Sequence, residues 1–196
     1  MPGSKSIAII GEGETEWFYF DSLRVAHRLP IKLSPQLPSH PDIASMMKTA
    51  ERCIAQEYDH VVCVVDMDRF HQFPADMQRY RQFRASLKFA QVGFIETYPC
   101  TEFWFLLHFL PGPQVRHFEN YDQLLPELRK YIPGYEKSLR FFRKTDIYRY
   151  LSEHGDLGKA RANAERLSEL SMLNPQDRIS YSEIYKIFSL LEELTK

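Results

Sequence analysis

The sequence predicts an α/β fold in which helices cover both faces of a mostly parallel sheet, followed by a C-terminal helical extension. Through the first 110 residues, short apolar runs typical of strands alternate with stretches of helical periodicity. Beyond Pro111 the pattern is typical of helices, and no further strand is expected. We therefore expect an α/β core over residues 1–110 and a helical extension over residues 111–196 that packs on it.

Two strands of the core have the clearest signals. Residues 5–10 form a short apolar run that Gly11 ends, and residues 61–65 (VVCVV) form a continuous apolar run typical of a parallel strand buried on both faces. Between them, prolines break the chain into a short strand and a loop, and Asp42 caps the next helix. The remaining elements expected from periodicity are helices at 15–29, 42–57, 75–90 and 101–110, a strand at 91–97, and extension helices at 120–131, 142–153, 157–170 and 180–195.

Composition places the chain among ordinary globular proteins. Of its 196 residues, 44% are hydrophobic and 26% are charged, and 25 Lys and Arg balance 26 Asp and Glu. The chain therefore has no bulk positive charge with which to hold a nucleic acid or an anionic membrane. Negative charge prevails in residues 1–70 and positive charge in residues 131–166. Any binding of a polyanion must come from local patches or from a metal.

Neither a membrane segment nor an export signal is expected. No apolar run approaches the roughly 20 residues of a membrane span. The N-terminal run is too short for a signal peptide. Cys53, Cys63 and Cys100 form no C-x-x-C pair, so we expect reduced thiols in a soluble, cytoplasmic protein that does not bind membranes.

Acidic residues follow both clear strands. Glu12 and Glu16 lie in the segment GEGETE, and Asp66 and Asp68 form a D-x-D after VVCVV. Because the carboxyl ends of parallel strands meet at one edge of a sheet, we expect these four carboxylates to converge. A lone D-x-D more often caps a turn, but its occurrence together with GEGETE favours a Mg²⁺ or Mn²⁺ site, since hard cations prefer oxygen ligands. Glu14 has no place in this pattern and is expected to be a solvated residue of the first helical turn.

Three segments, IIGEGETEWFYF, VVDMDRF and YPCTEFWFLLHF, resemble the RloB-like proteins, a branch of the Toprim-domain superfamily, and the similarity covers nearly the whole chain. The resemblance implies a Toprim-like core with metal-dependent nuclease activity. It implies Glu12 as general acid or base and metal ligand, Asp66 and Asp68 as metal ligands, and Glu16 as a further acidic ligand. It also implies a toxic effector of anti-phage defence that attacks RNA, such as transfer RNA, in preference to DNA, with an ABC-type ATPase encoded nearby as a partner.

The segment YPCTEFWFLLHF places Glu102 and His108 in an otherwise apolar helix. RloB-like proteins often have SNPCFE where this chain has TYPCTE, a change that keeps every acidic position. A polar side chain inside an apolar helix needs a partner, so either residue is a candidate for the crevice. We expect His108 to transfer a proton or to contact phosphate, and Glu102 to be an accessory metal ligand or a structural carboxylate.

Two stretches supply cations for a nucleic acid. The candidate nucleic-acid-binding residues are Arg81, Arg84, Lys88, Arg140, Arg143 and Lys144. The first three recur on one face of the helix expected at 75–90, which is also typical of a solvated outer face. The last three are interleaved with Phe and Tyr, a mixture that suits single-stranded or looped RNA. Lys137, in the segment GYEKS, matches a Tyr-x-Lys of the RloB-like proteins, and this match implies a catalytic role.

Two other functions stay open. A binding module without turnover would act as the regulatory partner of the ATPase, although the intact Glu12, Asp66 and Asp68 argue against it. A phosphatase similar to the haloacid dehalogenases would use Asp66 as its nucleophile, which explains VVCVVDMD but not GEGETE. The oligomeric state stays open as well, a homodimer included.

Overall fold

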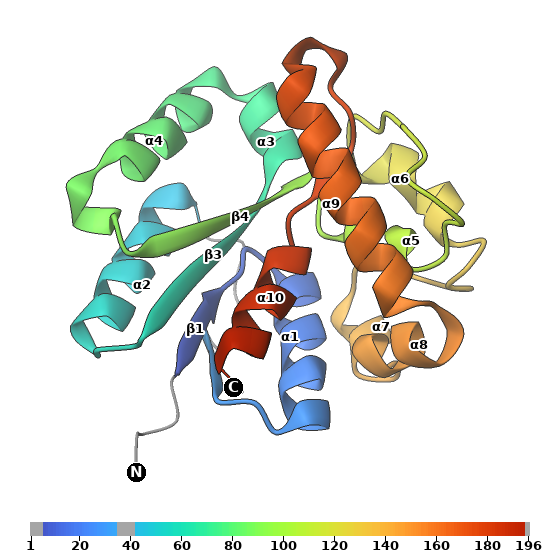
Figure 1. Cartoon of the computed structure of the whole chain (residues 1–196), viewed down its shortest axis with the longest axis horizontal. Helices are drawn as coiled ribbons and strands as arrows, with labels where there is room; N and C mark the ends of the chain where they lie inside the picture. The colour runs from blue at the N-terminus through green and yellow to red at the C-terminus, as the bar shows by residue number, and fades with distance from the viewer. Residues whose placement is uncertain (1–5, 35–41, 195–196) are drawn as a thin grey trace.

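The structure is a computed structural model that describes residues 6–34 and 42–194. Its strands form one five-stranded sheet in the order β2-β1-β3-β4-β5. They are β1 (Ile7–Ile10), β2 (Ile31–Ser34), β3 (His60–Asp66), β4 (Val92–Tyr98) and β5 (Tyr181–Ser182). The first four are parallel, and β5 pairs antiparallel with β4. The predicted α/β class with a mostly parallel sheet is confirmed (Figure 1).

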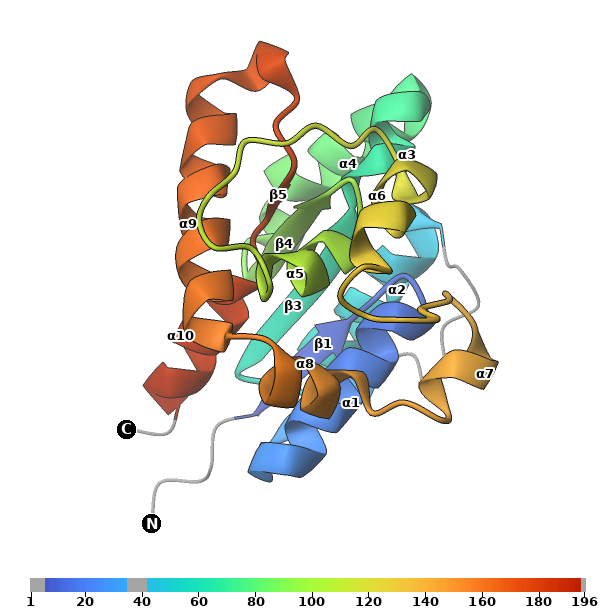
Figure 2. The same ribbon diagram turned by 90° about the vertical axis from the view of Figure 1, so that its right-hand side faces the viewer.

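Helices cover both faces of the sheet (Figures 1 and 2). One face carries α2 (Ile43–Ala55), α3 (Met67–Gln72) and α4 (Pro74–Ala85). The other carries α1 (Glu14–His27) and α5 (Glu102–Leu107). Around these two pack the helices of the extension, which are α6 (Tyr121–Leu128), α7 (Leu139–Phe142), α8 (Ile147–His154), α9 (Leu157–Leu173) and α10 (Tyr185–Leu194).

The central strands supply side chains to a core on each face. In β1, Ile7 and Ile9 belong to the core beneath α1, whereas Ala8 and Ile10 belong to the core beneath α2. All four side chains are buried, which is why this strand and β3 have continuous apolar sequences instead of alternating ones. The strands therefore have no solvent-facing side, and polar groups are displaced to their ends.

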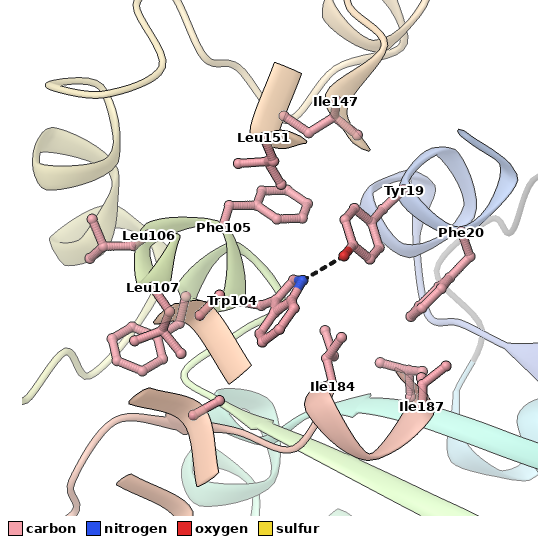
Figure 3. Close-up of a cluster of buried hydrophobic side chains, with 14 of the residues drawn as sticks. Tyr19, Phe20, Trp104, Phe105, Leu106, Leu107, Ile147, Leu151, Ile184 and Ile187 are labelled. Carbon is pink, nitrogen blue, oxygen red and sulfur yellow. Dashed lines mark hydrogen bonds between the residues drawn. The ribbon is translucent and has the colours of Figure 1, made fainter. Parts of the chain in front are cut away.

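Trp104 of α5 lies in the larger core (Figure 3). Its Nε1 donates a hydrogen bond to the hydroxyl of Tyr19 in α1 at 2.7 Å, and both side chains are fully buried. Leu151 of α8 and Ile187 of α10 lie in the same cluster (Figure 3). Burying a large apolar side chain contributes about 2 kcal/mol. The extension thus completes the core of the sheet and does not build a separate one.

One prediction for the extension is wrong, because β5 adds a strand where only helices were expected. It pairs with the end of β4 and widens the sheet at that edge. A strand of two residues is too short to show the alternation by which strands are recognised in a sequence. The helix expected at 180–195 accordingly begins only at Tyr185.

Several helix boundaries also differ from expectation. The helix expected at 75–90 ends at Ala85, where a 3₁₀ turn (Leu87–Phe89) follows. The helix expected at 142–153 is two helices, α7 and α8, and α3 begins directly after β3, in residues for which no helix was expected. Sequence signals are weakest at helix ends. Of the proline-rich segment, the expected short strand is β2, and residues 35–41 lie outside the described residues.

Within residues 6–34 and 42–194, no helix has both the length and the apolar character needed to cross a membrane. All three cysteines are buried thiols and none forms a disulfide. Their predicted reduced state agrees with this arrangement.

Candidate functional site

The two acidic segments meet at the carboxyl ends of β1 and β3, which are neighbours in the sheet. Glu12 follows β1, and Asp66 is the last residue of β3. The backbone N–H of Asp66 donates a hydrogen bond to Oε1 of Glu12 at 3.2 Å. The expected convergence of GEGETE and DMD is therefore present in the fold.

A glycine lets the first acidic loop fold tightly over the start of α1. A Cβ placed on Gly11 would lie only 2.6 Å from the Cβ of Glu16, so a larger residue would push that side chain away. Oε2 of Glu16 accepts a hydrogen bond from the backbone N–H of Gly13 at 2.7 Å. Its Oε1 is buried without a hydrogen-bond partner. Glu16 is thus held at the site with one oxygen free.

Asp66 is fixed by donors from the neighbouring strand and the turn after it. Its Oδ1 accepts hydrogen bonds from the Thr97 hydroxyl (2.9 Å) and from the backbone N–H and hydroxyl of Thr101 (2.8 and 3.1 Å). Its Oδ2 lies 3.7 Å from Nζ of Lys137. One oxygen is therefore saturated by neutral donors, and the other faces a cation.

Glu102 joins the site from the first turn of α5 and is fully buried. Its Oε1 accepts hydrogen bonds from the Thr15 hydroxyl at 2.8 Å and from the Tyr135 hydroxyl at 3.0 Å. Nζ of Lys137 lies 3.4 Å from the same oxygen. Its Oε2 has no hydrogen-bond partner. A buried polar atom without a partner costs free energy, so this oxygen calls for a ligand.

Lys137 places an ammonium group between Asp66 and Glu102. The structure brings this lysine to the carboxylates, and its catalytic role stays a prediction that rests on the resemblance of GYEKS. The ring of Tyr121 lies 5.7 Å from the Lys137 ammonium and adds a cation–π contact.

Asp68 stands at the rim of the site. It lies in the first turn of α3, and its Oδ1 accepts a hydrogen bond from the backbone N–H of Arg69 at 2.6 Å. Its own N–H donates to the carbonyl of Pro99 at 3.1 Å. The side chain is only partly buried, which leaves it open to solvent and to ligands.

Crowding raises the pKa values of three of these acids. Burial raises the pKa of Glu12 well above its usual value, and Asp66 and Glu16 raise it further by like charge. Burial and then Glu16 raise the pKa of Asp66 to about 7, although Lys137 opposes this. Burial and Asp66 raise the pKa of Asp68 to about 6. The expected effect of like charge on Glu12 is present, but burial is the larger cause.

Glu102 and Lys137 behave as an ionised pair. Burial would raise the pKa of Glu102, but Lys137 and several hydrogen-bond donors hold it below its usual value. Burial likewise opposes the ammonium, yet Glu102 and Asp66 hold the pKa of Lys137 well above its usual value. Both groups therefore remain charged around neutral pH.

The residues present fit a hard divalent cation. In the described part of the chain, no three Asp, Glu, His or Cys side chains are gathered closely enough to hold an ion as they stand. Even so, Oε1 of Glu16 and Oε2 of Glu102 are buried and unpartnered, and Asp66 and Glu102 share the ammonium group of Lys137. Carboxylate oxygens in excess of their counter-charge are the donor set that Mg²⁺ and Mn²⁺ prefer.

The prediction for His108 is not met, because this histidine does not join the carboxylates. Its side chain is buried, Nδ1 lies 2.9 Å from the carbonyl oxygen of Trp104, and the two rings pack edge to face. Burial lowers the pKa of His108 to about 4, so the ring is neutral at pH 7. Against its other side, a Cβ on Gly155 would lie 2.7 Å from the Cβ of His108. His108 is a packing residue of α5 and its neighbours.

The predicted basic residues divide into two groups. Arg84 forms an ion pair with Glu96, and Nζ of Lys88 lies 2.8 Å from Glu51, so both have structural partners. The other four are exposed, and no acidic residue of the described chain forms an ion pair with them; they are Arg81, Arg140, Arg143 and Lys144. These four remain candidates for a polyanion.

Hydroxyl donors that organise the acids were missed in the sequence. Thr15, Thr97 and Thr101 hold Glu102 and Asp66, and Tyr135 donates to Glu102 from the extension. The threonines lie inside the segments GEGETE and TYPCTE, and that position is the signal that could have identified them. Tyr135 stands two residues before Lys137 in GYEKS.

The comparisons with known proteins agree with the motifs. The model of the family described as RloB-like protein matches residues 7–194 of this chain. No curated protein and no solved structure matches it. The match spans every strand of the sheet, the acidic loops and Lys137, and so the chain belongs to the RloB-like proteins.

Proposed function

We propose that this chain is a metal-dependent nuclease of the Toprim type that cleaves phosphodiester bonds in nucleic acid. The observation that carries the proposal is the hydrogen bond from the backbone of Asp66 to Glu12. It joins an E-G turn and a D-x-D at the carboxyl ends of adjacent parallel strands, where ligands of open α/β sheets bind.

The residues at this edge suit phosphodiester chemistry. A bound Mg²⁺ or Mn²⁺ supplies positive charge to the scissile phosphate. Asp66, Asp68 and Glu16 offer the oxygens that hold such an ion. Glu12 has a raised pKa and is half-buried, so it can take a proton from the attacking water or return one to the leaving oxygen. Lys137 orients Asp66 and Glu102, keeps Glu102 ionised and opposes the rise in the pKa of Asp66.

RNA is the proposed substrate class, and transfer RNA is its first candidate. This preference, the role as a toxic effector of anti-phage defence and the partnership with an ABC-type ATPase rest on the resemblance to the Toprim superfamily. The exposed Arg140, Arg143 and Lys144 support a polyanionic substrate.

The test is a cleavage assay with purified protein on transfer RNA, single-stranded RNA and plasmid DNA, with Mg²⁺, Mn²⁺ or EDTA. The parent chain is compared with Glu12→Gln and Asp66→Asn. Glu14→Gln is the matched control, because it removes one charge from the same loop and its carboxylate has no partner among the described residues. We expect divalent-dependent cleavage that falls by at least about 100-fold in the first two variants and is retained in the control.

The same assay separates the other two functions. Cleavage that survives both Glu12→Gln and Asp66→Asn would refute the proposed site. A thermal shift with Mn²⁺ but no cleavage of any nucleic acid would favour a regulatory binding module. Hydrolysis of a small phosphate ester that is lost in Asp66→Asn but retained in Glu12→Gln would favour a phosphatase.

A further inference from the structure

A cavity lies beside the carboxyl end of β4 and is lined in part by residues of α3 and α4. It has a volume of about 280 Å³ and opens between α3, α4 and the 3₁₀ turn η2 (Pro175–Asp177). Its polar lining includes His71, Arg81, Arg84 and Arg178. We call it the arginine pocket. Most ligand sites have volumes of about 300 to 1,000 Å³, and a volume just below this range suits one nucleotide unit better than a larger molecule.

Two of the three guanidinium groups in the arginine pocket have no anionic partner. Arg84 is committed to Glu96. Arg81 and Arg178 are exposed, and no carboxylate of the described residues forms an ion pair with either. Burial lowers the pKa of His71, and Arg178 and Arg81 lower it further while Glu96 opposes them. Unpaired arginines that line one cavity form a site for an anion, because the guanidinium fork matches phosphate in shape and charge.

Aromatic side chains line the arginine pocket together with these charges. The rings of His71 and Tyr98 meet at 4.9 Å between centroids, and Tyr181 lies 6.5 Å from Tyr98. The hydroxyls of Tyr80 and Tyr181, which also line the pocket, both donate hydrogen bonds to Glu96 and are therefore not free to bind a ligand. Flat rings beside unpaired arginines suit a ligand that carries both a base and a phosphate.

The arginine pocket and the carboxylate site are connected through neighbouring residues of the chain. Met67, which lines the pocket, stands between Asp66 and Asp68 in the chain. The backbone of Asp68 donates to Pro99, and Pro99 directly follows Tyr98 of the pocket. The pocket therefore lies next to Asp68, at the rim of the carboxylate site.

We propose that the arginine pocket binds the nucleotide next to the phosphodiester bond that is cleaved, with Arg81 and Arg178 on its phosphate and the rings of His71 and Tyr98 beside its base. This assignment rests on the proposed nuclease function. Arg178 has a left-handed backbone (φ 46°), and its carbonyl accepts a hydrogen bond from His117 at 2.6 Å. These features fix the position of Arg178 at the pocket.

The test measures binding without cleavage. The full chain carrying Asp66→Asn is titrated into fluorescein-labelled single-stranded RNA and DNA decamers in EDTA, and anisotropy is followed at several salt concentrations. Arg81→Gln with Arg178→Asn forms the test variant, because Asn tolerates the left-handed backbone at 178. Arg79→Gln with Arg166→Gln removes the same charge from exposed arginines of α4 and α9 that already pair with Asp76 and Glu169.

We expect the test variant to bind at least about tenfold more weakly. The slope of log affinity against log salt concentration should fall by about two, because two phosphate contacts are lost. The control pair should change affinity by less than about threefold. Preference for one of the two decamers identifies RNA or DNA as the source of the nucleotide. Equal losses in the two pairs of variants, or no loss in either, would overturn the proposal, as would full competition by a polyglutamate peptide of matched charge.

The outcomes also separate the arginine pocket from the nuclease. If binding depends on Arg81 and Arg178 but the parent chain cleaves no nucleic acid, the pocket is a nucleotide site. Its assignment to the nucleotide beside a scissile bond would then be wrong. If the parent chain shows metal-dependent cleavage and the Arg81 and Arg178 substitutions leave its kcat and KM unchanged, the nuclease function is supported. The proposed binding of a nucleotide in the arginine pocket would then be wrong.

Discussion

Glu96 and Glu102 are two carboxylates near the same end of the sheet, and their surroundings differ sharply. In Glu96, Oε1 accepts from the Tyr80 hydroxyl and from Arg84, and Oε2 accepts from the Tyr181 hydroxyl. Glu102 is more deeply buried, yet its hydrogen-bond donors all converge on Oε1. Its Oε2 is left without a partner.

The difference teaches how to tell a structural acid from a candidate ligand. Both oxygens of Glu96 are used to fasten β4 to its neighbours, and nothing in that arrangement improves when an ion is added. Glu102 is held in place through one oxygen and offers the other, which is the arrangement of a side chain prepared for a ligand. Burial alone does not distinguish the two, whereas the distribution of donors does.

The largest effect on stability is expected when the cationic partner of each acid is removed. Lys137→Met should lower the free energy of unfolding by about 3 kcal/mol at pH 8, because it leaves Asp66 and Glu102 buried without their counter-charge. Arg84→Met should cost at most about 1 kcal/mol, since that arginine is half-exposed and Glu96 keeps its two tyrosines. Urea unfolding without divalent ions measures both values. Equal losses would contradict the distinction drawn between the two acids.

The second effect is a dependence of stability on pH. The pKa of Asp66 is raised to about 7 and that of Asp68 to about 6, so in this range the folded chain binds more protons than the unfolded chain. Stability should therefore be greatest below about pH 4 for these groups and fall as the pH rises to about 7, by on the order of 2 kcal/mol. The measurement is the difference between the parent chain and Asp66→Asn in thermal melts from pH 4.5 to 8. Parallel curves would disprove the assignment, whereas added Mg²⁺ should restore stability mainly at the high end.

Two amide substitutions should change stability least. They should also differ most clearly in their response to Mn²⁺. Glu96→Gln and Glu102→Gln should each cost about 1 kcal/mol, because an amide oxygen still accepts from the tyrosine hydroxyls. The increase in Tm produced by Mn²⁺ should be unchanged in Glu96→Gln and strongly reduced in Glu102→Gln. An unchanged response in Glu102→Gln would remove this residue from the candidate ligands.

The parts of the molecule that could be predicted from sequence are those with strong local signals. The strands β1 and β3 have continuous apolar runs, and their acidic endings meet because parallel neighbours share an edge. The position of Lys137 came from the resemblance of GYEKS, since no spacing rule connects residue 137 to residue 66. His108 shows the opposite case: a polar residue in an apolar helix was expected to face the crevice, and the carbonyl of Trp104 satisfies it instead.

Features that depend on distant segments could not be predicted. β5 is two residues long and exists because it completes the edge of β4. Arg178 joins Arg81 at one cavity from almost a hundred residues away, and no spacing rule connects the two positions. Such contacts between distant segments depend on how the extension packs on the sheet, which local periodicity does not encode.

The two hydrogen bonds between α1 and α5, from Thr15 to Glu102 and from Trp104 to Tyr19, tie these helices together at the site and again one turn deeper in α1. Neither helix can slide or rotate against the other without breaking a buried contact. The acidic loop before α1 and the carboxylate of Glu102 therefore form one mechanical unit. Native-state amide exchange should report this coupling as a shared opening event, in which protons of both helices exchange at the same slow rate.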